Sequence, residues 1–150
     1  MSTIEELIRQ KSFPSEQYKA IIHLLYTGNW VYNQSATRLK KFGITPEQFN
    51  VLRILRGSHP TPLMLQDITN RMIHKSSNAT RLVEKLRLKG LVTREICPTN
   101  RRQVDITITA KGLQLLARID EDQKEWPELH HKITRHEARE LNRILEKLRS

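Results

Sequence analysis

Cysteine is nearly absent from this chain of 150 residues. Cys97 is the single cysteine, so an intramolecular disulfide and a cysteine-rich metal site are both excluded. The sequence also lacks a run of about 18 apolar residues, the length that a membrane-spanning helix needs. Its first ten residues, MSTIEELIRQ, include acids and lack the apolar core of a secretion signal. We therefore expect a cytoplasmic protein with no membrane partner.

Aromatic residues and catalytic motifs are scarce as well. Aromatics make up 5% of the chain, so the buried core should be mainly aliphatic. We find no GxxxxGK phosphate loop, no nucleophile paired with a base, and no histidine pair spaced as in a zinc site. The sequence therefore predicts a protein that is not an enzyme and that uses no cofactor and no metal.

Acidic residues are outnumbered, with 16 Asp and Glu against 26 Lys and Arg and a formal charge of +10. A polyanionic partner is the first inference, double-stranded DNA before a membrane surface, although chance also makes soluble proteins basic. Within 71–102 the only acids are Glu84 and Glu95. The basic residues of this segment are Arg71, Lys75, Arg81, Lys85, Arg87, Lys89, Arg94, Arg101 and Arg102.

Caps and apolar spacing predict helices in the N-terminal half. Ser2 with Glu5 forms a capping box for a short first helix that should end near Pro14. Ser15 caps a long helix that continues to Lys40. Gly43 then follows in a left-handed turn. The tetrapeptide TPEQ at 45–48 begins the next helix, which Gly57 should stop before a turn at 58–62.

The centre of the chain predicts a helix, a tight turn, a second helix and a hairpin. Apolar residues from Leu65 to Met72 mark the first helix, and the turn is 73–75. The second helix should run from about Ser77 to Lys89 and end at Gly90. Strands are expected at 91–97 and 103–108, joined by a connection at 98–102.

The C-terminal part predicts two further helices. Thr109 is placed as the N-cap of a helix that Pro127 should break or kink. Thr134 and Glu137 form a capping box for a final amphipathic helix that reaches Leu148.

The start of the second central helix is small and polar, and arginines occupy the hairpin tip. Small polar residues can approach base edges closely, while flanking basic residues hold phosphates. A solvated basic face on an ordinary helix is the alternative. The candidate DNA-binding residues are Ser76, Ser77, Asn78, Thr80, Arg81, Lys85, Arg101 and Arg102.

Three blocks of the chain resemble the MarR family of bacterial winged helix-turn-helix transcription regulators. They are ITPEQFNVLRIL, ATRLVEKLRLKGLVTRE and PTNRRQVDITITAKGLQLL, which together cover about residues 44–117 in order. The resemblance implies a mainly α (α+β) single domain over 1–150. Its winged helix-turn-helix core would be about 44–109, between helical dimerisation regions at about 2–40 and 110–149. It also implies a homodimer with recognition helices in the major groove and wing arginines in the minor groove.

Two positions depart from the family pattern. Asn100 stands where the wing usually has an aspartate that orients a wing arginine by a salt bridge, so we expect altered wing geometry here. Met64 stands where many members have a threonine cap. We therefore expect that helix to begin earlier, with Thr61 as its cap and Pro62 as its first residue.

The resemblance also implies a small aromatic or phenolic effector, bound between the dimerisation helices and the winged helix. Candidate pocket residues are His23, Tyr26, Trp30 and Phe49, and core packing or dimer contacts are the alternative. Cys97 is open to two interpretations, a small packing residue or a redox-sensing thiol.

We therefore expect a sequence-specific DNA-binding transcription regulator, a ligand-responsive repressor that binds an inverted-repeat operator as a homodimer. A nonspecific architectural DNA-binding protein is the alternative. A protein-interaction module that has lost DNA binding is a third possibility, which the retained Arg101 and Arg102 argue against.

Overall fold

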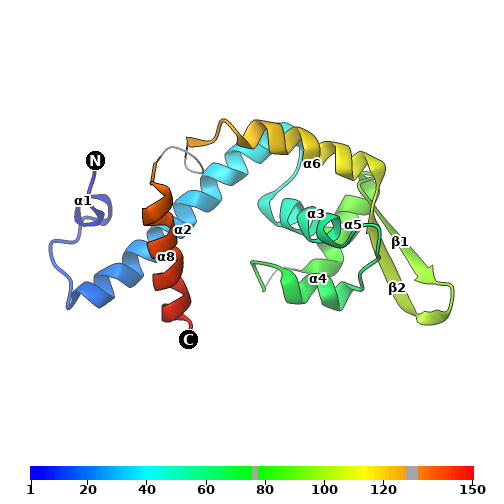
Figure 1. The fold of residues 1–150 in the computed structure, drawn as a ribbon, viewed down its shortest axis with the longest axis horizontal. Coiled ribbons are helices and arrows are strands. Elements are labelled where there is room, and N and C mark those ends of the chain that lie inside the picture. The colour runs from blue at the N-terminus through cyan, green and yellow to red at the C-terminus, as the bar shows by residue number, and fades with distance from the viewer. Residues whose placement is uncertain (76–77, 128–131) are drawn as a thin grey trace.

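Helices dominate the computed structural model, which describes residues 1–75, 78–127 and 132–150. Figure 1 shows the long helix α2 leading towards a group formed by α3, α4, α5 and one β-hairpin, with α1 and α8 at the opposite end. The predicted mainly helical fold with a two-stranded antiparallel sheet is confirmed. Within the described ranges, no helix is long and apolar enough to cross a membrane.

The N-terminal helices begin at hydroxyl caps. Helix α1 is Ile4–Ile8, and its capping box is Thr3 with Glu6, so the predicted pair one residue earlier is wrong. It ends at Arg9, well before the predicted end near Pro14, because Arg9 adopts a left-handed conformation. Helix α2 is Glu16–Leu39, and the Ser15 side chain accepts the N–H of Tyr18, as its predicted cap requires.

The next junction follows the sequence closely. A short 3₁₀ helix, η1 at Lys40–Phe42, ends at Gly43 with φ 72°, the left-handed turn predicted there. Helix α3 is Pro46–Ser58, with the predicted capping box of Thr45 and Gln48. Gly57 does not stop α3, because it lies inside the final turn. Pro60 instead restricts His59 to a non-helical backbone, which ends the helix.

The first of the two central helices starts later than the sequence predicted. Helix α4 is Leu65–Arg71, and the Met64 N–H donates to Asp67 Oδ2 at 3.1 Å. The predicted start at Thr61 and Pro62 is therefore wrong: Met64 is the N-cap, and the Asp67 carboxylate of the first turn accepts its backbone N–H. Helix α5 is Ala79–Leu88, and its predicted start at about Ser77 lies outside the described residues.

The hairpin consists of β1 at Val92–Cys97 and β2 at Asn100–Ile108. The prediction put 100–102 in the connection, but these residues begin β2 and only Pro98 and Thr99 join the strands. A register shift between Ile96 and Cys97 brings Asn100 opposite Cys97 and lengthens the second strand. Leu63 also bridges to Ile106, which attaches the segment before α4 to the sheet.

Helix α6 is Ala110–Gln123 and begins at the predicted cap Thr109. Thr109 also donates its hydroxyl to Gly90 O at 2.7 Å, which holds the end of α5 beside the start of α6. Gly112 is required at this crossing, because an added Cβ would lie 2.4 Å from Leu91 O. Helix α8 is Arg135–Leu148, with the predicted capping box of Thr134 and Glu137.

The core lies where α3, α4, α5, the hairpin and α6 meet, and it is mainly aliphatic as composition suggested. Trp126, after α6, is one of its two aromatic members within the described residues. Its indole N–H donates to Asp122 at 3.0 Å, Lys41 pairs with the same carboxylate, and the Arg38 guanidinium lies 5.2 Å from the indole ring centre. These contacts attach the end of α6 to the end of α2.

Candidate nucleic-acid interface

The turn between α4 and α5 is anchored on the two helices behind it. The Ile73 N–H donates to the Asn50 side chain of α3 at 2.9 Å. His74 stacks edge-on against Tyr32 of α2, with ring centres 5.5 Å apart. These contacts link the approach to α5 with both the long helix and α3. Ser76 and Ser77, two of the predicted DNA-binding residues, lie outside the described residues.

One face of helix α5 packs into the core, and the polar residues of the helix remain exposed. Ala79, Val83 and Leu86 are buried in the core. Thr80 and Arg81 in the first turn are exposed. The helix therefore presents its start to solvent as a rigid element, because the buried stripe determines which way the other residues point.

Asn78 has a structural role that the sequence prediction did not assign. Its Oδ1 accepts the Arg81 N–H at 3.0 Å, so Asn78 is the N-cap of α5. The same side chain also carries an amide N–H₂ group, which can act as a hydrogen-bond donor.

The two wing arginines begin β2 and point to opposite faces of the hairpin, because side chains alternate along a strand. Arg102 shares the face of Val104 and Ile106, which turn towards the core. Asn100 Oδ1 accepts the Arg102 N–H at 3.1 Å, so it orders the start of the strand through the backbone. Asn100 carries no charge, so this contact is a hydrogen bond and not a salt bridge.

The acidic residue on α5 is neutralised by a neighbour. Arg87 donates to both carboxylate oxygens of Glu84, at 2.9 and 2.7 Å. This hydrogen bonding, helped by the nearby positive charge of Arg94, holds the pKa of Glu84 below its ordinary value. Glu84 is therefore ionised at neutral pH but paired, and the surface around it stays basic overall.

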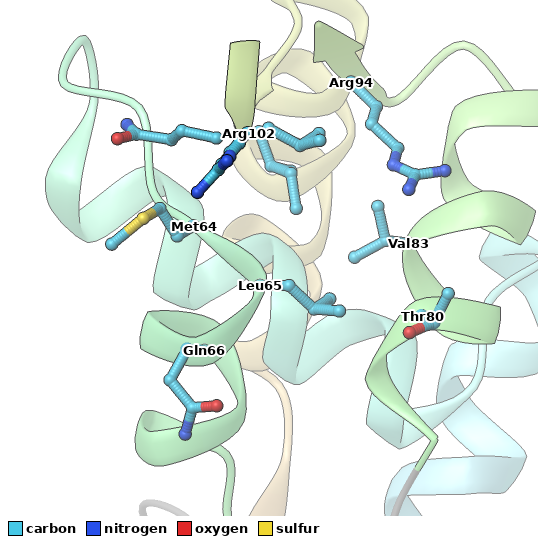
Figure 2. A pocket seen from close by; sticks show the side chains of 10 residues that line it. Met64, Leu65, Gln66, Thr80, Val83, Arg94 and Arg102 are labelled. Carbon is cyan, nitrogen blue, oxygen red and sulfur yellow. The ribbon is translucent and has the colours of Figure 1, made fainter. Parts of the chain in front are cut away.

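A cleft of about 270 Å³ lies between α4, α5 and the inner face of the hairpin. Figure 2 shows Arg94 and Arg102 on the hairpin side of this cleft, facing Thr80 and Val83 of α5 and Leu65 of α4. The sequence prediction of site residues missed Arg94. The alternation of side chains along the strand could have identified it. Arg94 pairs with the buried Ile106, so its side chain turns towards α5.

A second hollow, of about 690 Å³, lies between α2, the start of α3 and the end of α5. Its walls are apolar and basic, with Tyr32, Ala36 and Leu88 beside Lys40 and Lys85. Lys85, predicted to bind DNA, therefore lines this groove as well as the surface of α5. The lysines suit a negatively charged group, and the apolar side chains suit a ring.

The predicted effector residues are divided between two environments. Phe49 is buried and belongs to the core. His23, Tyr26 and Trp30 are exposed on α2. Their role in ligand binding stays a prediction, and so do the DNA contacts of the residues named above. No group of three potential metal ligands is found in the ranges that the structure describes.

Known proteins resemble this chain in the segment that contains the helices and the hairpin described above. The model of the MarR family matches residues 44–104. The HTH-type transcriptional regulator MhqR of Bacillus subtilis (strain 168) is 38% identical over 80 residues, 52% of each chain. The chain therefore spans about half the length of MhqR, and the same holds for YkoM of that organism, at 51%.

Two other similarities extend over most of the chain. The HTH-type transcriptional repressor IacR of Pseudomonas putida is 30% identical over 139 residues, 92% of this chain and 78% of that protein. The crystal structure of a MarR transcription factor from Planctomyces limnophilus is 31% identical, with a TM-score of 0.68 over 90% of this chain and 98% of that one. With sequence, fold and the winged helix-turn-helix matching over this length, the chain belongs to the MarR family.

Proposed function

We propose that this protein is a sequence-specific DNA-binding transcription regulator. The observation that carries the proposal is the exposed polar start of α5, capped by Asn78, beside a hairpin whose second strand carries Arg101 and Arg102 near its tip. A helix of this kind enters the major groove, and a basic hairpin tip reaches the adjacent minor groove. Arg81 is the residue that we assign to base readout, and Ser76, Ser77 and Thr80 are further proposed DNA contacts.

We also propose that the protein acts as a homodimer on an inverted repeat. Helix α8 has no buried residue, and Leu141, Ile144 and Leu148 are each about half exposed on it. Apolar side chains of α2, such as Leu25 and Trp30, are also exposed in the single chain. A second copy would cover these faces, and two-fold symmetry would place two recognition helices on paired half-sites.

Repression is the proposed mode of action, because IacR is a transcriptional repressor by name. The test is selection from random DNA followed by transcription in vitro. We expect the selected sequences to contain an inverted repeat and expect transcription to fall when that repeat overlaps the promoter. Equal binding to all sequences would instead support the alternative of a nonspecific architectural protein.

Arg81→Ala separates base readout from phosphate binding within the selected operator. Loss of a base contact should relax the preference at one operator position and cost about 1–3 kcal/mol. If affinity for every sequence falls equally, Arg81 binds phosphate and the base-reading role is lost.

A small aromatic or phenolic anion is the proposed effector, and the groove beside Tyr32 is its proposed site. Lys40 and Lys85 would pair with the anion, while Ala36 and Leu88 would contact the ring. The RdhR regulator, which shares the fold at 16% identity and a TM-score of 0.78, was solved in a 2,4-dichlorophenol-bound form. Calorimetry with this phenol and with benzoate should give binding that the Leu88→Lys variant abolishes; unchanged binding in that variant would place the ligand elsewhere.

A further inference from the structure

The cleft between α5 and the hairpin contains a basic residue that the proposed DNA-reading surface has not used. We propose that Arg94 binds a phosphate of the DNA strand that passes between the recognition helix and the wing. This inference rests on the proposed function and assigns a further contact to it.

The positions of the two DNA grooves support this contact. If α5 enters a major groove and the hairpin tip enters the next minor groove, one sugar-phosphate strand separates them. That strand must cross the space between α5 and the hairpin, where the 270 Å³ cleft is situated. A positive residue at this place meets phosphate rather than a base edge.

The direction of the Arg94 side chain also supports this contact. Arg94 pairs across the hairpin with Ile106, which is 1% exposed, so both side chains lie on the face towards α5. Figure 2 shows the Arg94 guanidinium extending from β1 towards Val83 and Thr80. The opposite strand contributes Arg102 to the same cleft, so two positive side chains flank it.

The acid on which the charge of Arg94 acts is already paired with another residue. Glu84, whose pKa is lowered in part by Arg94, is bound through both carboxylate oxygens by Arg87. Arg94 has no ion pair among the residues that the structure describes, and its side chain is exposed. The floor of the cleft is apolar, with Val83 and Ile106, and such surroundings strengthen a contact between opposite charges.

The Thr80 hydroxyl lies across the cleft from Arg94 and can donate to a second oxygen of the same phosphate. Arg94 and Thr80 therefore offer one charged and one neutral donor from two different elements. Such a contact would fix the angle between α5 and the DNA and would carry no base preference.

The test uses the full-length protein and an operator selected with it. Arg94→Gln should weaken binding about tenfold or more at each half-site, equally for all sequences. The slope of log affinity against log salt should become shallower by about one for each half-site. Arg94→Lys should restore the slope, and Lys124→Gln, at the end of α6 away from the hairpin, should change neither quantity.

Operators carrying one neutral methylphosphonate at a time give an independent readout. The wild-type protein should lose affinity when one particular phosphate per half-site is neutral, and Arg94→Gln should be insensitive to that same substitution. An unchanged salt slope in Arg94→Gln would overturn the role of Arg94. The same conclusion would follow if, at every phosphate, the affinity lost on neutralisation simply added to the affinity lost in Arg94→Gln. If the wild-type protein selects no operator at all, the proposed function fails instead.

Discussion

The Tyr32 hydroxyl donates a 2.7 Å hydrogen bond to Glu47 Oε1, which joins the long helix α2 to the first turn of α3. His74, in the turn before α5, packs edge-on against the same tyrosine ring. One side chain of α2 therefore contacts both the start of α3 and the approach to the recognition helix. Tyr32 also lines the groove proposed for the effector.

Glu47 should contribute to stability in a pH-dependent manner. Burial by itself raises the pKa of Glu47, but the hydrogen bond from Tyr32, the backbone N–H and the nearby His74 outweigh it and lower the pKa. A carboxylate whose pKa is lowered by folding stabilises the protein above its unfolded pKa of about 4.3, and this stability is lost as the pH falls through the folded value. Thermal unfolding between pH 7 and pH 3 should therefore show a smaller acid loss in Glu47→Gln than in the wild type.

Tyr32→Phe removes the hydroxyl and keeps the ring. We expect a loss of about 1 kcal/mol in the free energy of unfolding, since a partly exposed hydrogen bond to a carboxylate is broken. For a chain of this size, that loss corresponds to a fall of about 2–4 °C in the midpoint of thermal unfolding. A variant with unchanged stability at pH 7 would show that this bond is not maintained in solution.

Gly112→Ala and Gly57→Ala should change stability in opposite directions. An added Cβ at Gly112 would lie 2.6 Å from Ile108 Cγ1, while Gly57 has no atom within 4 Å of that position. We expect Gly112→Ala to cost about 1–3 kcal/mol through overpacking. Gly57→Ala, in an exposed helical position, should stabilise by about 0.5–1 kcal/mol. Urea unfolding of both variants compares the two directly.

Asn78 can be tested as a helix cap separately from its predicted DNA contact. Asn78→Ala should reduce the free energy of unfolding by about 1 kcal/mol, because the Arg81 N–H loses its acceptor. Asn78→Ser keeps an acceptor and should fold with nearly wild-type stability while lacking the amide donor. If Asn78→Ser also binds the selected operator like the wild type, Asn78 acts as a cap alone.

The exposed face of α8 should hold the proposed dimer together. Leu141→Lys combined with Ile144→Lys adds charge to two half-exposed apolar positions and should dissociate the dimer. Arg143→Ala is the matched control, because Arg143 lies on the same helix and pairs with Glu140 of its own chain. Sedimentation should find a monomer for the double variant and a dimer for the control; dimers in both would exclude this face.

The sequence alone determined most helix starts, because caps act over three or four residues. Ser15, Thr45, Thr109 and Thr134 each accept the backbone N–H that their spacing predicts. Two predicted starts, at Ser2 and Thr61, were wrong. In each case another nearby side chain accepts the hydrogen bond at the helix start, Thr3 in α1 and Asp67 in α4. The polar start of α5 was equally visible in sequence, since its buried stripe has the period of a helix.

Only the tertiary structure decided which residues share a cleft or a groove. Arg94 and Thr80 are 14 positions apart and meet because the hairpin folds back onto α5. Likewise, Tyr32 and Lys85 share a groove because α2 and the end of α5 approach each other, and Phe49 is drawn into the core, away from the exposed face of α2. Local hydrogen bonds encode where an element begins, whereas the contacts between elements depend on how all buried faces pack at once.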